Sequence, residues 1–262
     1  MDSPPSSPIL DALRGRAREA APRARAPYSG RSSGAALLLS DGRWAPGVRV
    51  ESASYPLSIP ALVGGLVTAF SAGRHDVRAV ALSTPFLPGE AAWLADALGF
   101  VVSAEEPDVL AFGAEPLPEV GARLELSGDA PESDEAGVRM ARAVAERAHV
   151  PESGFRVGCV LVTASGQVVP GCNVEHADWT RGLCAERSAL AAAAAYGAGP
   201  IQRIYLSCPA DPRGTPCGAC RQLLAEYAAD VPIVMDRGDA APEETTAGAL
   251  LPQFFSGDSL RL

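Results

Sequence analysis

The sequence predicts an α/β protein made of two tandem copies of one unit, each a mixed sheet between layers of helices. Three observations predict this fold class. Helical and strand-like segments alternate along the chain, and they follow the same order in both halves. The halves are also related by a constant shift of 124 residues, which carries Pro27-Tyr28-Ser29-Gly30 onto Pro151-Glu152-Ser153-Gly154. At 262 residues the chain is long enough for two units of ordinary size.

The shift of 124 residues needs no gap between Pro27 and Pro85. It superposes turn residues and strand ends: Gly42 on Gly166, Pro46-Gly47 on Pro170-Gly171, Glu51 on Glu175, Ala61 on Ala185, Gly73 on Gly197 and Leu82-Ser83 on Leu206-Ser207. Agreement of this kind indicates an internal repeat. Because the glycines and prolines of the turns are kept, we expect the course of the backbone to be kept as well.

Each half begins with an amphipathic pattern that predicts a helix, near 9–24 and near 134–149. Strands and turns follow, with the turns at Asp41-Gly42 and Ser165-Gly166. The other expected elements, as pairs from the two halves, are strands at 34–40 and 157–163, strands at 44–50 and 167–174, helices from about 60 and 184, strands at 77–83 and 201–207, helices from about 89 and 217, and strands at 107–112 and 231–235.

A segment rich in Pro, Gly, Ser and acidic residues separates the two patterns, from Gly113 to Asp134. This composition is typical of a linker. We therefore expect two domains, residues 1–126 and residues 127–262.

Three cysteines and a glutamate in the second half have the pattern of a metal site. A structural zinc takes four protein ligands, whereas a hydrolytic zinc takes three and keeps one position open, so Cys184, Cys217 and Cys220 fit the second kind. Pro216 favours a helix start that would place Cys217 and Cys220 on one face, and Cys184 precedes a run of strong helix formers. The positive ends of two helices would favour the thiolate form that binds zinc.

The Cys-x-x-Cys pair alone has other interpretations. It could be a redox pair, but that leaves Cys184 and Glu186 unexplained. It could be half of a structural zinc site, but such a site lacks its fourth ligand. His176 could serve in principle, although an isolated histidine is more often a polar surface residue.

Three blocks in the second half closely resemble the cytidine deaminases that have an all-cysteine zinc site. They are Gly171-Cys172-Asn173-Val174-Glu175, Leu183-Cys184-Ala185-Glu186-Arg187-Ser188-Ala189-Leu190 and Pro216-Cys217-Gly218-Ala219-Cys220-Arg221-Gln222-Leu223-Leu224. The match extends from Ser153-Gly154-Phe155-Arg156-Val157-Gly158 to Leu250-Leu251-Pro252-Gln253-Phe254-Phe255. The resemblance implies tandem copies of the three-layer α/β/α cytidine-deaminase-like fold, one Zn²⁺ per chain, and hydrolytic deamination of cytidine or deoxycytidine in pyrimidine salvage.

The same resemblance assigns roles to the cluster. Zinc held by Cys184, Cys217 and Cys220 would provide a hydroxide as nucleophile, and Glu186, which is not a ligand, would be the proton shuttle. Arg187 would donate to the sulfurs and offset the negative charge of three thiolates.

Substrate contacts are implied for residues around the cluster. Asn173 and Glu175 would bind the ribose hydroxyls, Phe155 would pack against the base, and Ala185 would also contact the substrate. Where the family often has asparagine and tyrosine, this chain has His176 and Trp179. These two differences leave open another cytosine nucleoside as substrate, such as a nucleoside antibiotic.

The first half keeps the repeat but not the chemistry. Cys184 corresponds to Pro60, Glu186 to Leu62, Asn173 to Arg49 and Phe155 to Arg31. Pro88-Gly89-Glu90-Ala91-Ala92 stands where the Pro-Cys-x-x-Cys block is expected. We therefore expect a degenerate deaminase domain without a zinc site. An unrelated site in this half is the alternative, but no cluster of acid, base and nucleophile supports it.

The resemblance also implies an assembly in which neighbouring units complete each active site. Two chains would form a homodimer with a pseudo-tetrameric core, and Phe255 would reach a neighbouring pocket. A net charge of −9 argues against a nucleic-acid partner. No apolar run is long enough for a membrane span, and Met1-Asp2-Ser3-Pro4-Pro5 does not begin a secretory signal, so we expect a cytoplasmic protein. A zinc-stabilised binding protein without catalysis is the alternative from another functional class.

Overall fold

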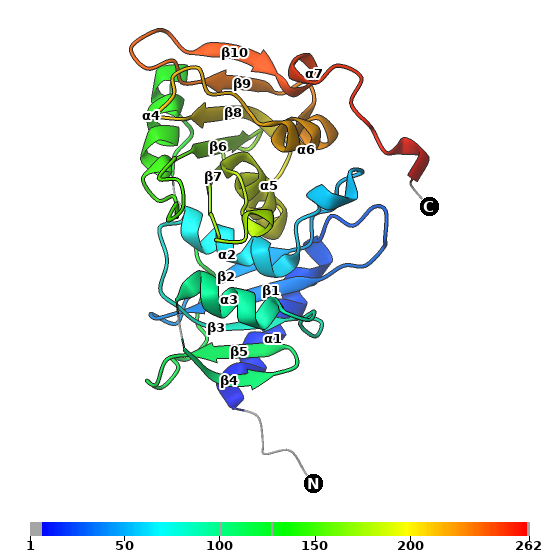
Figure 1. The fold of residues 1–262 in the computed structure, drawn as a ribbon, viewed down its shortest axis with the longest axis vertical. Helices are drawn as coiled ribbons and strands as arrows, with labels where there is room; N and C mark the ends of the chain where they lie inside the picture. The colour runs from blue at the N-terminus through cyan, green and yellow to red at the C-terminus, as the bar shows by residue number, and fades with distance from the viewer. Residues whose placement is uncertain (1–6, 100, 127, 261–262) are drawn as a thin grey trace.

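The structure is a computed structural model that describes residues 7–99, 101–126 and 128–260. Figure 1 shows two halves stacked along the long axis, each with one five-stranded sheet and its own helices. Residues 1–6, on which the expectation about a signal segment depends, and residue 127, at the expected domain boundary, lie outside the described part.

The first half contains α1 and the sheet β2-β1-β3-β5-β4. Its elements in chain order are α1 (Pro8–Ala20), η1 (Ala21–Arg23), β1 (Gly34–Leu39), β2 (Trp44–Val48), η2 (Tyr55–Leu57), α2 (Ala61–Ser71), β3 (Val77–Leu82), α3 (Glu90–Leu98), β4 (Val102–Glu106) and β5 (Val109–Phe112). Every element expected in this half is present, and β4 is additional.

The second half contains the sheet β10-β9-β8-β6-β7. Its elements are α4 (Asp134–Ala145), β6 (Gly158–Thr163), β7 (Val168–Cys172), η3 (Trp179–Arg181), α5 (Ala185–Tyr196), β8 (Ile201–Ser207), α6 (Gly218–Ala228), β9 (Pro232–Met235), β10 (Glu243–Thr246), α7 (Ala247–Leu250) and η4 (Asp258–Leu260). All expected elements are present here too, and η3, β10, α7 and η4 are additional.

Helices cover both faces of each sheet, and repeated glycines make their close approach possible. A Cβ on Gly158 would lie 2.0 Å from a carbonyl oxygen of α4, and a Cβ on Gly171 would lie 2.2 Å from one of α5. Gly158 pairs with Cys172 and Gly171 with Cys159, so the two glycines face opposite sides of the sheet. Gly34 and Gly47 meet α1 and α2 in the same way, each at 2.3 Å. The expected three-layer arrangement is therefore confirmed in both halves.

The two sheets differ in strand direction. In the second half β8 and β9 are parallel, because α6 crosses over between them, and the sheet is mixed as expected. In the first half β5 lies beside β3 but runs antiparallel to it. The chain leaves α3, forms the edge strand β4, and returns as β5 through a hairpin. The strand expected at 107–112 is present as β5, and all described pairings of this sheet are antiparallel, where a mixed sheet was expected.

Helices α2 and α5 pack against each other between the halves, so one apolar core runs through both (Figure 1). The segment expected as a linker is docked rather than free. Leu124 is buried, its N–H donates to the carbonyl of Trp44, and its own carbonyl accepts from the hydroxyl of Tyr196. In the part of the chain that the structure describes, no helix combines the length and apolarity needed to cross a bilayer.

Candidate active site

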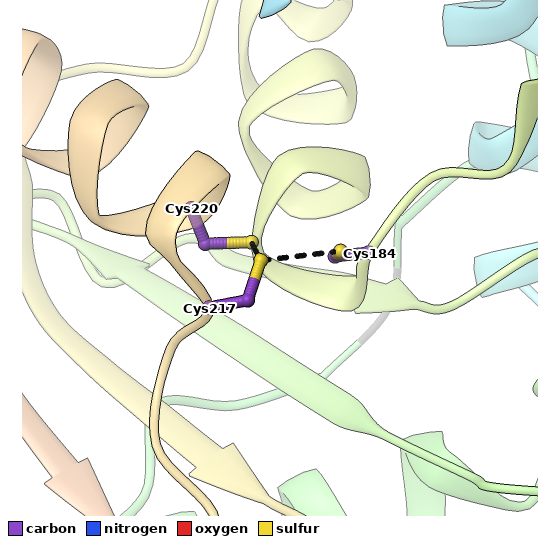
Figure 2. A group of neighbouring side chains, drawn as sticks. All are labelled: Cys184, Cys217 and Cys220. Carbon is purple, nitrogen blue, oxygen red and sulfur yellow. Dashed lines mark hydrogen bonds between the residues drawn. The ribbon is translucent and has the colours of Figure 1, made fainter. Parts of the chain in front are cut away.

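Two helix starts bring the three cysteines together. Cys184 is the N-cap of α5 and Cys217 is the N-cap of α6, whose first turn carries Cys220. The helix begins at Gly218, so Pro216 lies just before it rather than opening it as expected. Figure 2 shows the three sulfurs pointing toward one another. The Sγ–Sγ distances are 3.7 Å for Cys184–Cys217 and 3.5 Å for Cys217–Cys220.

These distances fit a zinc ion. Sulfurs about 2.3 Å from a tetrahedral zinc are about 3.8 Å from one another, close to the spacing seen here. The three ligand atoms all lie within 4.8 Å of each other. Three thiol ligands without a fourth protein ligand leave one position open, which is the arrangement of a hydrolytic zinc.

The surroundings shift the pKa values of the three thiols in opposite directions. Hydrogen bonding with Cys184 and Cys220 lowers the pKa of Cys217. The backbone N–H groups of Ala219 and Cys220, at the start of α6, lower it further. The contacts that favour the Cys217 thiolate raise the pKa of Cys184 and of Cys220. Zinc binds thiolates, so metal binding would release the protons that these thiols carry.

Glu186 lies in the first turn of α5 and is only 4% exposed. Burial raises the pKa of its carboxyl group to about 7. The carboxyl is outside the group of three ligand atoms but lines the same cavity as Cys184 and Cys217. A buried carboxyl beside the open side of a metal site can accept and return protons.

The cavity has a volume of about 510 Å³ and is formed by the second half alone. The expected contact residues Phe155, Asn173 and Glu175 line it, as does Trp179. The loop between β8 and α6 supplies further lining residues that the sequence analysis did not single out: Cys208, Asp211, Arg213, Gly214 and Thr215. Only the proximity of this loop to Pro216-Cys217 could have indicated them.

Asn173 is held in place by the backbone of the neighbouring segment that leads into β6. Its Oδ1 accepts from the N–H of Val157, and its Nδ2 donates to the carbonyl of Phe155, both at 2.8 Å. The amide keeps one N–H and one lone pair for a ligand.

Glu175 is engaged by its own chain. Its carboxylate accepts from the N–H groups of Glu152 and Ser153, at 3.1 and 3.0 Å, and from the hydroxyl of Ser153. In the first half, Glu51 accepts in the same way from the N–H groups of Tyr28 and Ser29 and from the hydroxyl of Ser29. A contact present in both copies holds the loop in place, and the repeated Ser-Gly was the signal for it in the sequence.

The other predicted site residues lie outside the cavity lining. Arg187 donates from Nη2 to the carbonyl of Leu57 at 2.9 Å, and its buried Nε has no partner in the described part of the chain. Ala185 is fully buried, beside Gly171. Phe255 is 54% exposed, and its carbonyl accepts from Gln222.

The first half offers no comparable cluster. Pro60 takes the N-cap position of α2 that Cys184 has in α5, and Leu62 is buried where Glu186 stands. Among the described residues, Cys184, Cys217 and Cys220 are the one group of three side chains arranged to hold a metal ion.

Comparison with known proteins agrees with this site. Residues 131–235 match the cytidine and deoxycytidylate deaminase zinc-binding region, and residues 2–83 match a second family of that description. A cytidine deaminase of Sporosarcina psychrophila is 35% identical over 116 residues, which are 44% of this chain and 85% of that protein. A probable cytidine deaminase of Dictyostelium discoideum is 36% identical over 114 residues, 43% of this chain and 77% of that protein.

Among solved structures, the cytidine deaminase from Burkholderia pseudomallei has 38% sequence identity and a TM-score of 0.45, over 47% of this chain and 99% of that chain. The sequence relatives are matched over most of their own length, and both halves match deaminase zinc-binding families. The chain therefore belongs to the cytidine deaminase family.

Proposed function

We propose that this protein catalyses the zinc-dependent hydrolytic deamination of cytidine and deoxycytidine to uridine and deoxyuridine, as a step of pyrimidine salvage. One observation carries the proposal. Three cysteine sulfurs at the spacing of zinc ligands share a cavity with a buried carboxyl group that is not part of the ligand cluster. The relatives are named cytidine deaminases, which supports the choice of substrate.

Cys184, Cys217 and Cys220 would hold the metal, which supplies the Lewis acidity that makes water a nucleophile near neutral pH. Glu186 takes a proton from the attacking water and gives it to ring N3, so that C4 becomes electrophilic. After the C4–O bond has formed, Glu186 takes the proton of the new C4 hydroxyl and delivers it to the amino nitrogen; the C4–N bond breaks, ammonia leaves and C4 becomes a carbonyl carbon. One water is consumed for each ammonia released.

The cavity walls would position the nucleoside. Asn173 and Glu175 face the ribose hydroxyls in this proposal, since both keep acceptor lone pairs beyond their contacts with the chain. Phe155 packs against the base. Ala185, buried behind these groups, completes the substrate-binding set. Arg187 offsets the negative charge of the thiolates.

The direct test is ammonia release from cytidine by the zinc-loaded protein and by Glu186→Gln. The amide keeps the size of the side chain but cannot shuttle the proton, so we expect turnover to fall by about 10³-fold or more with zinc content unchanged. Equal turnover of the two proteins would contradict the proposed role of Glu186. Full zinc content with no ammonia from any cytosine nucleoside would instead favour a zinc-stabilised binding protein.

A second substrate is favoured by one feature of the cavity. Trp179 lines it and is 68% exposed, and this chain has His176 and Trp179 where the family often has asparagine and tyrosine. Another cytosine nucleoside, such as a nucleoside antibiotic, would then be the preferred substrate of the same chemistry. Comparing kcat/KM for cytidine, deoxycytidine and base- or sugar-modified analogues distinguishes a cytidine deaminase from a deaminase of another cytosine nucleoside.

The proposal includes a division of labour and an assembly. Residues 127–262 perform the chemistry, and residues 1–126 replace a second unit around them. Two chains form a homodimer with a pseudo-tetrameric core in the cytoplasm, where Phe255, exposed and outside its own cavity, reaches a neighbouring pocket. Light scattering should give the mass of two chains, and a monomeric active protein would contradict this assembly.

A further inference from the structure

His149 in the second half and Arg25 in the first have equivalent backbone positions, but the side chains around these two positions differ. In the second half His149 forms a parallel bridge with Val174, and in the first half Arg25 forms the same bridge with Val50. The bonds around these bridges also correspond: the N–H of Glu175 donates to His149 and that of Glu51 donates to Arg25, both at 2.8 Å. The shift of 124 residues therefore relates His149 to Arg25 in space as well as in sequence.

On the His149 side the junction between the halves is filled by aromatic rings. Phe70, in α2, is 2% exposed, and its ring centroid lies 4.2 Å from that of His75 and 5.4 Å from that of His149. The rings come from both halves and contact one another at the junction.

On the Arg25 side the corresponding rings are missing. The shift relates Phe70 to Ala194 and His75 to Gly199, so a benzyl and an imidazole group are replaced by a methyl group and a hydrogen atom. A cavity of about 330 Å³ results, which we call the junction cavity. Its lining residues are Arg25 and Val50 from the first half and Leu190, Ala193, Ala194, Ala198, Gly199, Pro200, Ile201 and Tyr227 from the second.

Apart from one cation and one phenol, the side chains of the lining residues are apolar. Arg25 is the single charged side chain among the lining residues. Tyr227 donates its hydroxyl to the carbonyl of Glu51 at 2.6 Å, and burial raises its pKa, so the phenol stays neutral. The nearby carboxylate of Glu226 is occupied by Ser52 and the N–H of Ala53.

We propose that the junction cavity binds a small planar aromatic molecule that carries a negatively charged group. The ring of the ligand would take the place that Phe70 has on the other side of the junction, and its anionic group would pair with Arg25. Helix α5 forms one wall and begins next to Cys184, so the bound molecule stabilises the helix that carries Glu186. Binding at this cavity does not depend on the deaminase activity.

Titration calorimetry of the zinc-loaded full chain with 2-naphthoate tests the proposal. We expect one site per chain with a Kd below about 1 mM, and binding that excess uridine does not displace. The neutral analogue 2-naphthalenemethanol should bind about tenfold more weakly, because it cannot pair with Arg25. No binding up to about 1 mM, or displacement by uridine, would overturn the proposal.

Two variants place the binding in the junction cavity. Ala194→Phe combined with Gly199→His restores the rings of the other side, and a Cβ on Gly199 meets nothing within 4 Å. This double variant should bind 2-naphthoate at least about tenfold more weakly, while Gly15→His, in α1, should bind it as the parent does.

Arg25→Gln provides a second test if the double variant does not fold. The side chain of Arg25 is exposed, so we expect this variant to fold. It should weaken binding of 2-naphthoate several-fold and leave binding of 2-naphthalenemethanol unchanged. Unaltered binding of 2-naphthoate by either folded variant would overturn the proposal.

Discussion

Arg187, three residues after a metal-cluster cysteine, donates to the carbonyl oxygen of Leu57 in the other half at 2.9 Å. The side chain expected to donate to the cysteine sulfurs therefore connects the two copies of the fold. The positive charge of Arg187 acts on Glu186, whose pKa it helps to lower against the dominant effect of burial.

Replacing Arg187 by Ala should lower both zinc retention and turnover, the latter by about tenfold or more. The variant leaves the thiolate charge less compensated and the Leu57 carbonyl without its donor. Zinc per chain after dialysis and kcat for cytidine measure the two effects. Arg181→Ala is a matched control, since Arg181 pairs with the exposed Asp178. Unchanged zinc and kcat in Arg187→Ala would remove this residue from the mechanism.

Glu51→Gln and Glu175→Gln separate the structural and binding roles of one repeated contact. Each variant loses charge-assisted hydrogen bonds from a Ser and two N–H groups, so each should lower the free energy of unfolding by about 1–3 kcal/mol. Only Glu175 lines the cavity, so Glu175→Gln alone should also raise KM for cytidine. Urea unfolding and steady-state kinetics test both. A KM increase of equal size in Glu51→Gln would mean that the contact acts through the fold alone.

Acid should destabilise the protein partly through Asp236. Burial opposes ionisation of this carboxyl, but hydrogen bonds from Arg142 at 2.6 Å, from Ser207 and from the N–H of Gly238 outweigh it and lower its pKa to about 2. Because the unfolded chain has the ordinary, higher pKa, the stabilisation is complete above about pH 4 and is lost as the pH falls toward 2.

The contribution of Asp236 is about 2 kcal/mol at neutral pH. Urea unfolding of the parent and of Asp236→Asn measures this contribution. The pH should range from 6 down to the lowest pH at which both proteins still fold, which is about 3 for many domains. The difference in stability between the two proteins should shrink as the pH falls. A difference that does not vary with pH would show that Asp236 contributes only through packing.

The second half should not be stable as a separate protein. Its helix α5 packs against α2, and the Arg187–Leu57 bond crosses the junction, so residues 127–262 alone would expose apolar surface. We expect a lower Tm and lower activity than in the full chain. A fully active, monomeric fragment would show that residues 1–126 are not needed as a scaffold.

The sequence predicted the metal cluster because its ligands lie in two short blocks at helix starts, where spacing determines geometry. Cys184 and Cys217 both occupy N-caps, and their helices converge. The repeat predicted the order of elements in the first half from the second, and the structure confirms this order.

The features that were not predicted have two causes, a local hairpin in the first half and contacts between residues distant in sequence. Strand β5 runs antiparallel to β3 because the unexpected β4 precedes it, and a pattern of alternating apolar residues carries no information on direction. The partner of Arg187 lies 130 residues away, and the junction cavity depends on the absence of side chains at Ala194 and Gly199. Such relationships emerge only when both copies are placed together.

Zinc content and turnover measured together in Cys220→Ser and Cys208→Ala test the central claim most directly. Cys220 belongs to the metal cluster, whereas Cys208 lines the same cavity outside it. The parent and Cys208→Ala should retain one zinc per chain, and Cys220→Ser should lose most of its zinc together with ammonia release from cytidine. Full zinc and full turnover in folded Cys220→Ser would contradict the account.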